Sequence, residues 1–144
     1  MRVLLDTDVV LDLLADRQPF VVEASVLWLA HEQGRLEAFV SPITPVNVFY
    51  ILRKQQGAAP ARQVVGRLLT AVQICPLDRA ALDAAYALPL ADYEDALQAA
   101  TAAAAGLDAI VTRNITDYAG APLLILTPAE ALAHLSTGHP PAAP

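Results

Sequence analysis

The sequence is poor in several features that would assign it to particular classes of protein. Its single cysteine, Cys75, cannot form a disulfide within the chain, which argues against a disulfide-built extracellular domain. Mean hydropathy is high, at +0.43. However, the longest apolar stretch, 96–111, is interrupted by polar residues and glycine, and a membrane helix needs about 18 uninterrupted apolar residues. With no secretory signal pattern at the N-terminus, we expect a cytoplasmic protein that is not embedded in a membrane.

Positive charge is also scarce. The chain has 9 Lys and Arg against 15 Asp and Glu, a net charge of −6. This balance argues against a protein that coats nucleic acid through a general positive field. It does not exclude a nuclease, because carboxylates that hold divalent cations meet phosphate through the metal. The segment 48–70 contains no acid but carries Arg53, Lys54, Arg62 and Arg67. That cluster is either a solvated helix face or a phosphate-contacting patch.

What the sequence does contain is typical of one globular domain. Its 144 residues are 56% hydrophobic, enough to bury a core, and we expect a domain over 1–135 with a flexible tail over 136–144. Apolar strands are predicted at 2–5, 37–40, 72–75, 109–112 and 123–126. Helices are predicted at 9–15, 19–34, 42–57, 60–69, 78–88 and 92–106, and a last one follows the capping sequence 127–130. The alternation predicts an α/β fold, a three-layer sandwich with a central parallel sheet.

Acidic and amide residues gather where these strands end, which is where parallel sheets place their sites. The first cluster is Asp6, with Asp8 and Asp12. The second is Asp92 to Asp95, and the third spans 112–117.

Each cluster also has a structural explanation. Asp6 and Asp92 are placed to cap helices, and Asp117 lies in what reads as an ordinary hydrogen-bonded turn. Asn47 lies on or beside the apolar stripe of its predicted helix. It is therefore either an amide in the core with its hydrogen bonds made or a residue of the site. Asp95 leads a face of small residues turned towards the core, where a buried charge needs a partner such as a metal.

In their order and spacing, these motifs resemble the PIN-domain family, which includes the VapC-type toxin ribonucleases. Residues 3–10 resemble its opening strand and first acid, and residues 92–98 resemble its third-acid helix. Residues 110–118 resemble its final acidic loop, and residues 44–53 resemble a toxin-like branch that carries Asn where the family normally has Glu. The resemblance runs from Val3 to about Leu135, nearly the whole chain.

The resemblance implies a PIN-like, Rossmann-like sandwich that hydrolyses RNA phosphodiester bonds with Mg²⁺ or Mn²⁺, as the toxin of a toxin–antitoxin pair. The implied metal ligands and catalytic residues are Asp6, Asp95 and Asp117. The implied supporting residues are Asn47, Asn114, Thr112 and Asp92. Candidate RNA-phosphate contacts are Arg53, Lys54 and Arg113. The implied partners are the RNA substrate, a small antitoxin and a second copy of the chain.

Two other functions are compatible with the same residues. A haloacid-dehalogenase-like phosphatase would use Asp6 of the Asp-x-Asp motif as its nucleophile, although the only lysine, Lys54, falls on a predicted helix. A non-catalytic PIN module would bind RNA or a partner without cutting. No Cys or Ser nucleophile is paired with a suitable histidine. We expect His31 and His134 on helix surfaces and His139 in the tail, while Phe20, Trp28 and Phe49 are either exposed apolar residues or core.

Overall fold

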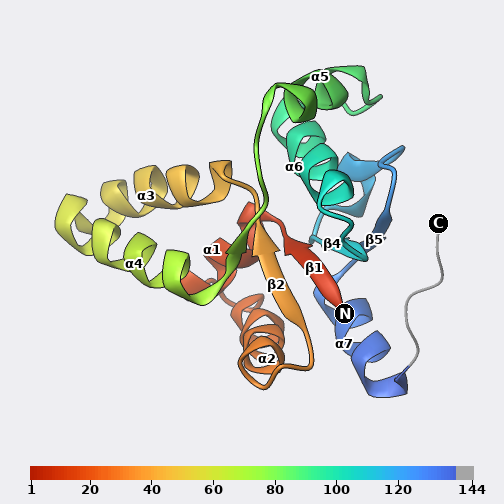
Figure 1. Ribbon diagram of the computed structural model, residues 1–144. Coiled ribbons are helices and arrows are strands. Elements are labelled where there is room, and N and C mark those ends of the chain that lie inside the picture. Colours follow the sequence, from red (N-terminus) through yellow and green to blue (C-terminus); the bar gives the residue numbers. More distant parts are fainter. Residues whose placement is uncertain (139–144) are drawn as a thin grey trace.

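A five-stranded, all-parallel sheet forms the centre of the computed structural model, which describes residues 1–138 (Figure 1). The strand order is β3-β2-β1-β4-β5. The strands are β1 (Arg2–Leu5), β2 (Glu37–Val40), β3 (Gln73–Ile74), β4 (Ala109–Val111) and β5 (Leu124–Leu126). The helices are α1 (Thr7–Leu14), α2 (Val21–Glu32), α3 (Ile43–Gln56), α4 (Ala58–Ala71), α5 (Arg79–Ala87), α6 (Tyr93–Ala104) and α7 (Pro128–Thr137), with a 3₁₀ turn η1 (Ile115–Tyr118). The predicted α/β sandwich with a central parallel sheet is confirmed.

Both faces of the sheet are covered, which explains why β1 and β2 are apolar and buried after their first residue and β4 is buried throughout. Val3 and Leu5 of β1 face the core that α1, α2 and α7 complete, and the inner sides of α3 and α4 join that core. Leu4 faces the opposite core, against Ala99 and Ala102 of α6. Helix α5 packs on α6 rather than directly on the sheet.

Several predicted boundaries shift at helix starts. Helix α1 begins at Thr7 rather than 9, directly after β1. Helix α2 begins at Val21, because Pro19 lies in the turn before it. Helix α4 begins at Ala58, so that Pro60 falls within its first turn, where a missing N–H costs little.

The other shifts concern a strand and the chain end. Strand β3 is limited to Gln73–Ile74, the two residues that pair with β2. Helix α7 runs through Thr137, two residues beyond the predicted domain end, and stops at Gly138, whose φ of 63° is the left-handed conformation common after helices. The rest of the predicted tail, including His139, lies outside the described residues.

Helices α3 and α4 form a hairpin that projects from the body of the molecule (Figure 1). The turn between them is Gly57, whose φ of 91° is a conformation that other residues rarely adopt. The start of α3 lies next to α1, where the hydroxyls of Thr44 and Thr7 are 3.0 Å apart. The hairpin therefore begins at the strand ends and extends away from them. Among the described residues, no helix is long and apolar enough to cross a membrane.

Candidate functional site

An acidic cleft of about 250 Å³ lies at the carboxyl ends of β1 and β4. These two strands are neighbours, and the chain turns to opposite sides of the sheet after them, which is where parallel α/β folds place their sites. The cleft is lined from four segments by Asp6, Thr7, Asp8, Leu11, Asn47, Ile51, Asp92, Glu94, Asp95, Asn114 and Asp117. The three predicted metal ligands therefore come together in one cleft.

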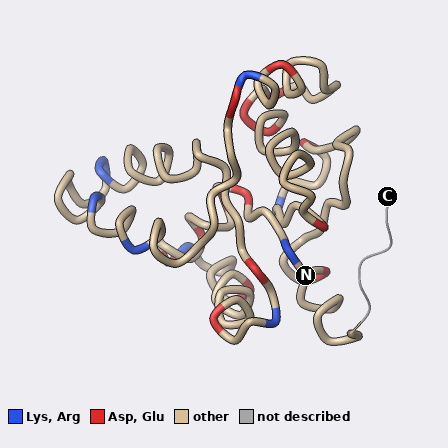
Figure 2. Tube along the Cα trace, in the orientation of Figure 1, with Lys and Arg blue, Asp and Glu red and all other residues tan. Residues whose placement is uncertain are grey.

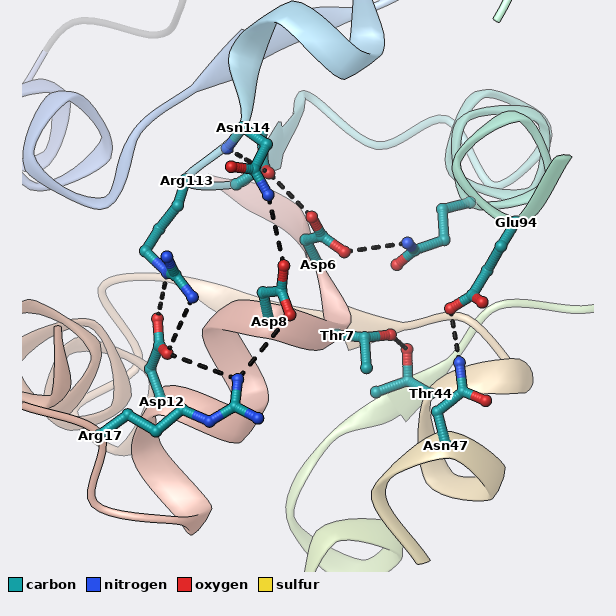
Figure 3. Close-up of polar contacts among 12 residues, drawn as sticks. Asp6, Thr7, Asp8, Asp12, Arg17, Thr44, Asn47, Glu94, Arg113 and Asn114 are labelled. Carbon is teal, nitrogen blue, oxygen red and sulfur yellow. Dashed lines mark hydrogen bonds and ion pairs between the residues drawn. The ribbon is translucent and has the colours of Figure 1, made fainter. Parts of the chain in front are cut away.

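Asp6 is the most tightly held acid of the cleft. It is 6% exposed, and its carboxylate accepts hydrogen bonds from Thr112 Oγ1 at 2.8 Å and Gln98 Nε2 at 2.9 Å. Asp6 is the N-cap residue of α1, as the capping alternative expects, but its side chain makes no capping hydrogen bond, so capping does not account for the carboxylate. Strand β1, helix α6 and the residue after β4 all contribute to fixing this one carboxylate (Figure 3).

The loop after β4 brings a second set of polar groups to the cleft. Thr112 Oγ1 accepts a hydrogen bond from the backbone N–H of Asn114 at 3.0 Å while donating to Asp6. Asn114 Nδ2 in turn donates to Asp8 Oδ2 at 3.3 Å (Figure 3). Asp117 follows in η1, exposed at the rim of the cleft. The hydroxyl of Thr112 thus links the position of this loop to that of the Asp6 carboxylate.

Helix α6 presents three acids at its start, and they differ in what they do. Asp92 caps the helix, because its Oδ1 accepts from the N–H groups of Glu94 and Asp95 at 2.9 and 3.1 Å. Asp95 lines the cleft. Glu94 lines it too, and its Oε1 accepts from Asn47 Nδ2 at 2.5 Å. Asn47 is therefore a cleft residue rather than a core amide.

Two residues of this arrangement, Glu94 and Gln98, were not predicted from the sequence. Gln98 is 1% exposed and donates from Nε2 to both Asp6 and the Tyr118 hydroxyl, at 2.9 and 3.0 Å. One signal was available for Gln98: it lies three residues after Asp95, which places both on one face of α6. Glu94 had no such signal, since a Glu in a first turn is explained by the helix dipole alone.

Arg113, a candidate phosphate contact, is already occupied. Its Nε donates to Asp12 Oδ2 at 2.7 Å and its Nη2 donates to Asp12 Oδ1 at 3.3 Å (Figure 3). The Arg113 guanidinium also lies over the ring of Phe20, 4.0 Å from its centroid. Asp12 is 1% exposed, and Arg17 lies 4.0 Å from it and 3.8 Å from Asp8. The geometry supports a structural ion pair for Arg113 and gives no support to a phosphate contact.

Other predicted residues lie away from the cleft. Arg53 and Lys54 are exposed on α3, outside the cleft lining. His31 lies on α2, as expected, but it is not a free surface residue. This ring is half-buried, with Nε2 2.7 Å from the Ala71 carbonyl and Nδ1 3.3 Å from both the Leu36 carbonyl and a backbone N–H of β2. It joins α2 to the end of α4.

Burial, together with neighbouring charges, raises the pKa values of three acids of the cleft, Asp6, Glu94 and Asp95. Burial raises the pKa of Asp6. Burial, then the charges of Asp92 and Asp6, raise the pKa of Glu94 against the opposing hydrogen bond from Asn47. The pKa of Asp95 rises to about 6, first through burial and then through the charge of Asp6. The side chains of the cleft by themselves therefore resist holding all of its negative charge.

This electrostatic strain predicts how stability depends on pH. The pKa of Asp95 is about 6 in the folded chain against a usual 3.8, so between these values the folded state binds more protons than the unfolded state. The loss of folding stability caused by ionising Asp95 is therefore absent near pH 4 and complete above pH 6. In chelator, Asp95→Asn should melt at a higher temperature than the wild type at pH 7. The difference should shrink towards pH 5, as measured by differential scanning calorimetry. A difference in melting temperature that does not change with pH would contradict this prediction.

The donor set of the cleft suits one kind of ligand. Its polar side chains offer carboxylate, amide and hydroxyl oxygens, which Mg²⁺ and Mn²⁺ prefer, and no sulfur or imidazole lines it. Within residues 1–138, no group of three Asp, Glu, His or Cys side chains lies close enough together to coordinate a metal ion. Mg²⁺ commonly binds through one or two carboxylates and keeps several waters, for which the cleft has room. In the same part of the chain, the one buried side-chain oxygen or nitrogen without a partner is Gln98 Oε1, on the amide that donates to Asp6.

The comparison with known families decides the assignment. A family model described as PIN domain matches residues 2–116. The chain belongs to the PIN domain family. No curated protein matches it significantly in sequence. This PIN domain resembles a chain of DNA-bound VapBC from Salmonella typhimurium, with a TM-score of 0.68 at 17% identity over 89% of this chain and 98% of that one.

Two further solved structures show the same fold at low identity. VapBC2 from Rickettsia felis, bound to a promoter DNA fragment, matches with a TM-score of 0.65 at 17% identity, over 88% of this chain and 98% of that one. FitAcB from Neisseria gonorrhoeae matches with a TM-score of 0.54 at 20% identity, over 88% and 98%. With the PIN family shown, and Lys54 exposed on α3 rather than at a strand end, the phosphatase interpretation has no support.

Proposed function

We infer that this PIN domain is an endoribonuclease that hydrolyses RNA phosphodiester bonds with Mg²⁺ or Mn²⁺. The observation that carries the inference is the convergence of Asp6, Asp95 and Asp117 from three distant segments on one cleft. Asp6 and Asp95 are held there at an unfavourable electrostatic cost, because burial raises the pKa of both carboxyls, and this cost favours a cationic ligand. Membership of the PIN domain family and the fold shared with VapBC chains support the proposed metal dependence and RNA substrate.

The residues of the cleft have distinct parts in this proposal. Asp6, held by Thr112 and Gln98, is the fixed ligand that sets where a cation sits. Asp95 of α6 and Asp117 of η1 line the same cleft, and Glu94 adds a further charge, oriented by Asn47. A divalent cation bound there would supply charge neutralisation at the scissile phosphate and activation of a water.

Removal of the metal tests this function. Purified wild-type protein with Mn²⁺ should cleave RNA, excess EDTA should stop cleavage, and added Mn²⁺ in excess of the chelator should restore it. Gel analysis of a 5′-labelled RNA measures the rate and shows whether cuts are internal. Cleavage that persists unchanged in EDTA would contradict metal dependence. RNA binding without cleavage under any divalent cation would instead indicate the non-catalytic module.

The partners follow from the same proposal. The matched structures carry two-component names, VapBC2, VapBC and FitAcB, and the motifs resemble VapC-type toxins. We therefore propose that this chain is a cytoplasmic toxin, a homodimer bound by a small antitoxin protein. Co-purification with the product of an adjacent short reading frame, with the particle mass from light scattering, tests the partner and the dimer. A monomer that retains no such product would contradict both.

A further inference from the structure

The α3–α4 hairpin carries a charge opposite to that of the rest of the molecule. It holds Arg53, Lys54, Arg62 and Arg67 and no acid. Since the whole chain carries −6, these four positive charges leave −10 on the remaining residues. All four cations are exposed, and none makes an ion pair within the described part of the chain. Figure 2 shows the projecting hairpin with no acidic segment along it.

The hairpin is continuous with the cleft. Asn47 and Ile51 of α3 line the cleft, and they are four residues apart on one helix face. Lys54 continues the same row three residues later, about 10 Å along the helix from Asn47. A chain of phosphates leaving the cleft along α3 would therefore meet a positive charge within two helical turns. The row of α3 that begins in the acidic cleft therefore leads to one of the hairpin's cations, Lys54.

A second row on α3 offers a surface for bases. Val46, Phe49 and Tyr50 form a shallow apolar groove with Val65 and Arg62 of α4. Tyr50 is 55% exposed and packs edge-on against Phe49, at 5.2 Å between ring centroids. An exposed aromatic ring beside cations is the combination on which proteins stack and hold single-stranded nucleic acid.

We propose that the α3–α4 hairpin binds single-stranded RNA and leads it into the acidic cleft. Arg53 and Lys54 contact phosphates beyond the cleft, and Tyr50 stacks with a base. The charge asymmetry explains how an acidic protein binds a polyanion: the body repels the strand and the hairpin attracts it, so that the strand is oriented before it reaches the cleft. The role of leading RNA into the cleft rests on the proposed nuclease function, but RNA binding by the hairpin does not require cleavage.

Fluorescence anisotropy with a labelled single-stranded RNA of about 16 nucleotides tests the proposal. The wild-type chain is titrated in excess EDTA at several salt concentrations, and RNA integrity is checked on a gel. At low salt, the variant Arg53→Gln/Lys54→Gln should have a lower affinity for RNA than the wild type. Each phosphate contact that is lost should lower the affinity roughly fivefold. The slope of log affinity against log salt should fall by about 0.7 for each such cation. Tyr50→Leu should weaken binding about fivefold or more while leaving the salt slope unchanged.

The matched control is Arg35→Gln/Arg79→Gln, which removes two exposed positive charges outside the hairpin and changes the net charge equally. Its affinity and salt slope should stay near those of the wild type. Equally weakened binding in the control and hairpin variants would overturn the proposal. So would unchanged RNA affinity in the hairpin variants together with a changed particle mass, because the hairpin would then be a protein interface.

Failure of this inference and failure of the proposed function are distinguishable. If wild-type protein cleaves RNA but the hairpin variants bind and cleave like it, the hairpin proposal fails and the nuclease stands. If no cation supports cleavage but the hairpin variants bind RNA more weakly as described, the nuclease fails and the RNA-binding surface stands.

Discussion

Asp6→Asn and Asp95→Asn should each abolish Mn²⁺-dependent RNA cleavage without lowering the melting temperature. Loss of a group that merely orients a metal ligand typically costs roughly 10- to 100-fold, so loss of a ligand itself should exceed about 100-fold. Stability should not fall, because burial raises the pKa of both acids, and a neutral amide therefore relieves a strained charge. Gel assays with Mn²⁺ measure the cleavage rate, and calorimetry in EDTA measures the melting temperature.

The split between activity and stability makes this test specific. If a carboxylate only supported the fold, its replacement would lower the cleavage rate and the melting temperature together. Asp83→Asn is the matched control, since Asp83 is an exposed acid on α5 that pairs with Arg79 at 3.0 Å, outside the cleft. Its cleavage rate should equal that of the wild type. Full activity in Asp6→Asn would show that Asp6 is not a metal ligand, and it would overturn the proposed site.

The parts of this site that could be predicted from sequence are those with local signals. Asp6 and Thr112 each follow an apolar strand directly, so that a parallel sheet brings them to the same edge. Asp95 and Asp117 could be added because they begin a helix and a turn next to that edge. The structure places all four around the same cleft or in contact with its acids.

The parts that escaped prediction depend on contacts between distant segments. Glu94 has the local appearance of a helix-dipole acid, and it is directed into the cleft by Asn47, 47 positions away. Arg113 looked free for phosphate because its partner, Asp12, is 101 positions away. A charged residue reveals its sign in the sequence, but whether that charge is free or paired is decided by packing.

The pairing of Arg113 with Asp12 leads to the second large effect. Arg113→Met should lower the free energy of unfolding by about 3–5 kcal/mol, because it leaves the carboxylate of Asp12 buried at 1% exposure without its close partner. Arg17, at 4.0 Å, is too far to replace the bond of 2.7 Å. Methionine keeps an apolar stem beneath Phe20, so the change isolates the charge. Urea denaturation followed by circular dichroism measures the change in unfolding free energy.

The double variant Asp12→Leu/Arg113→Met separates the burial of an unpaired charge from the loss of packing. Replacing both members of a buried pair with apolar residues is often neutral or stabilising, whereas removing one strands the other. The double variant should therefore recover most of the stability that Arg113→Met loses. If Arg113→Met alone costs less than about 1 kcal/mol, the pair behaves as a solvent-exposed one. In that case Arg113 would be free to meet phosphate after all.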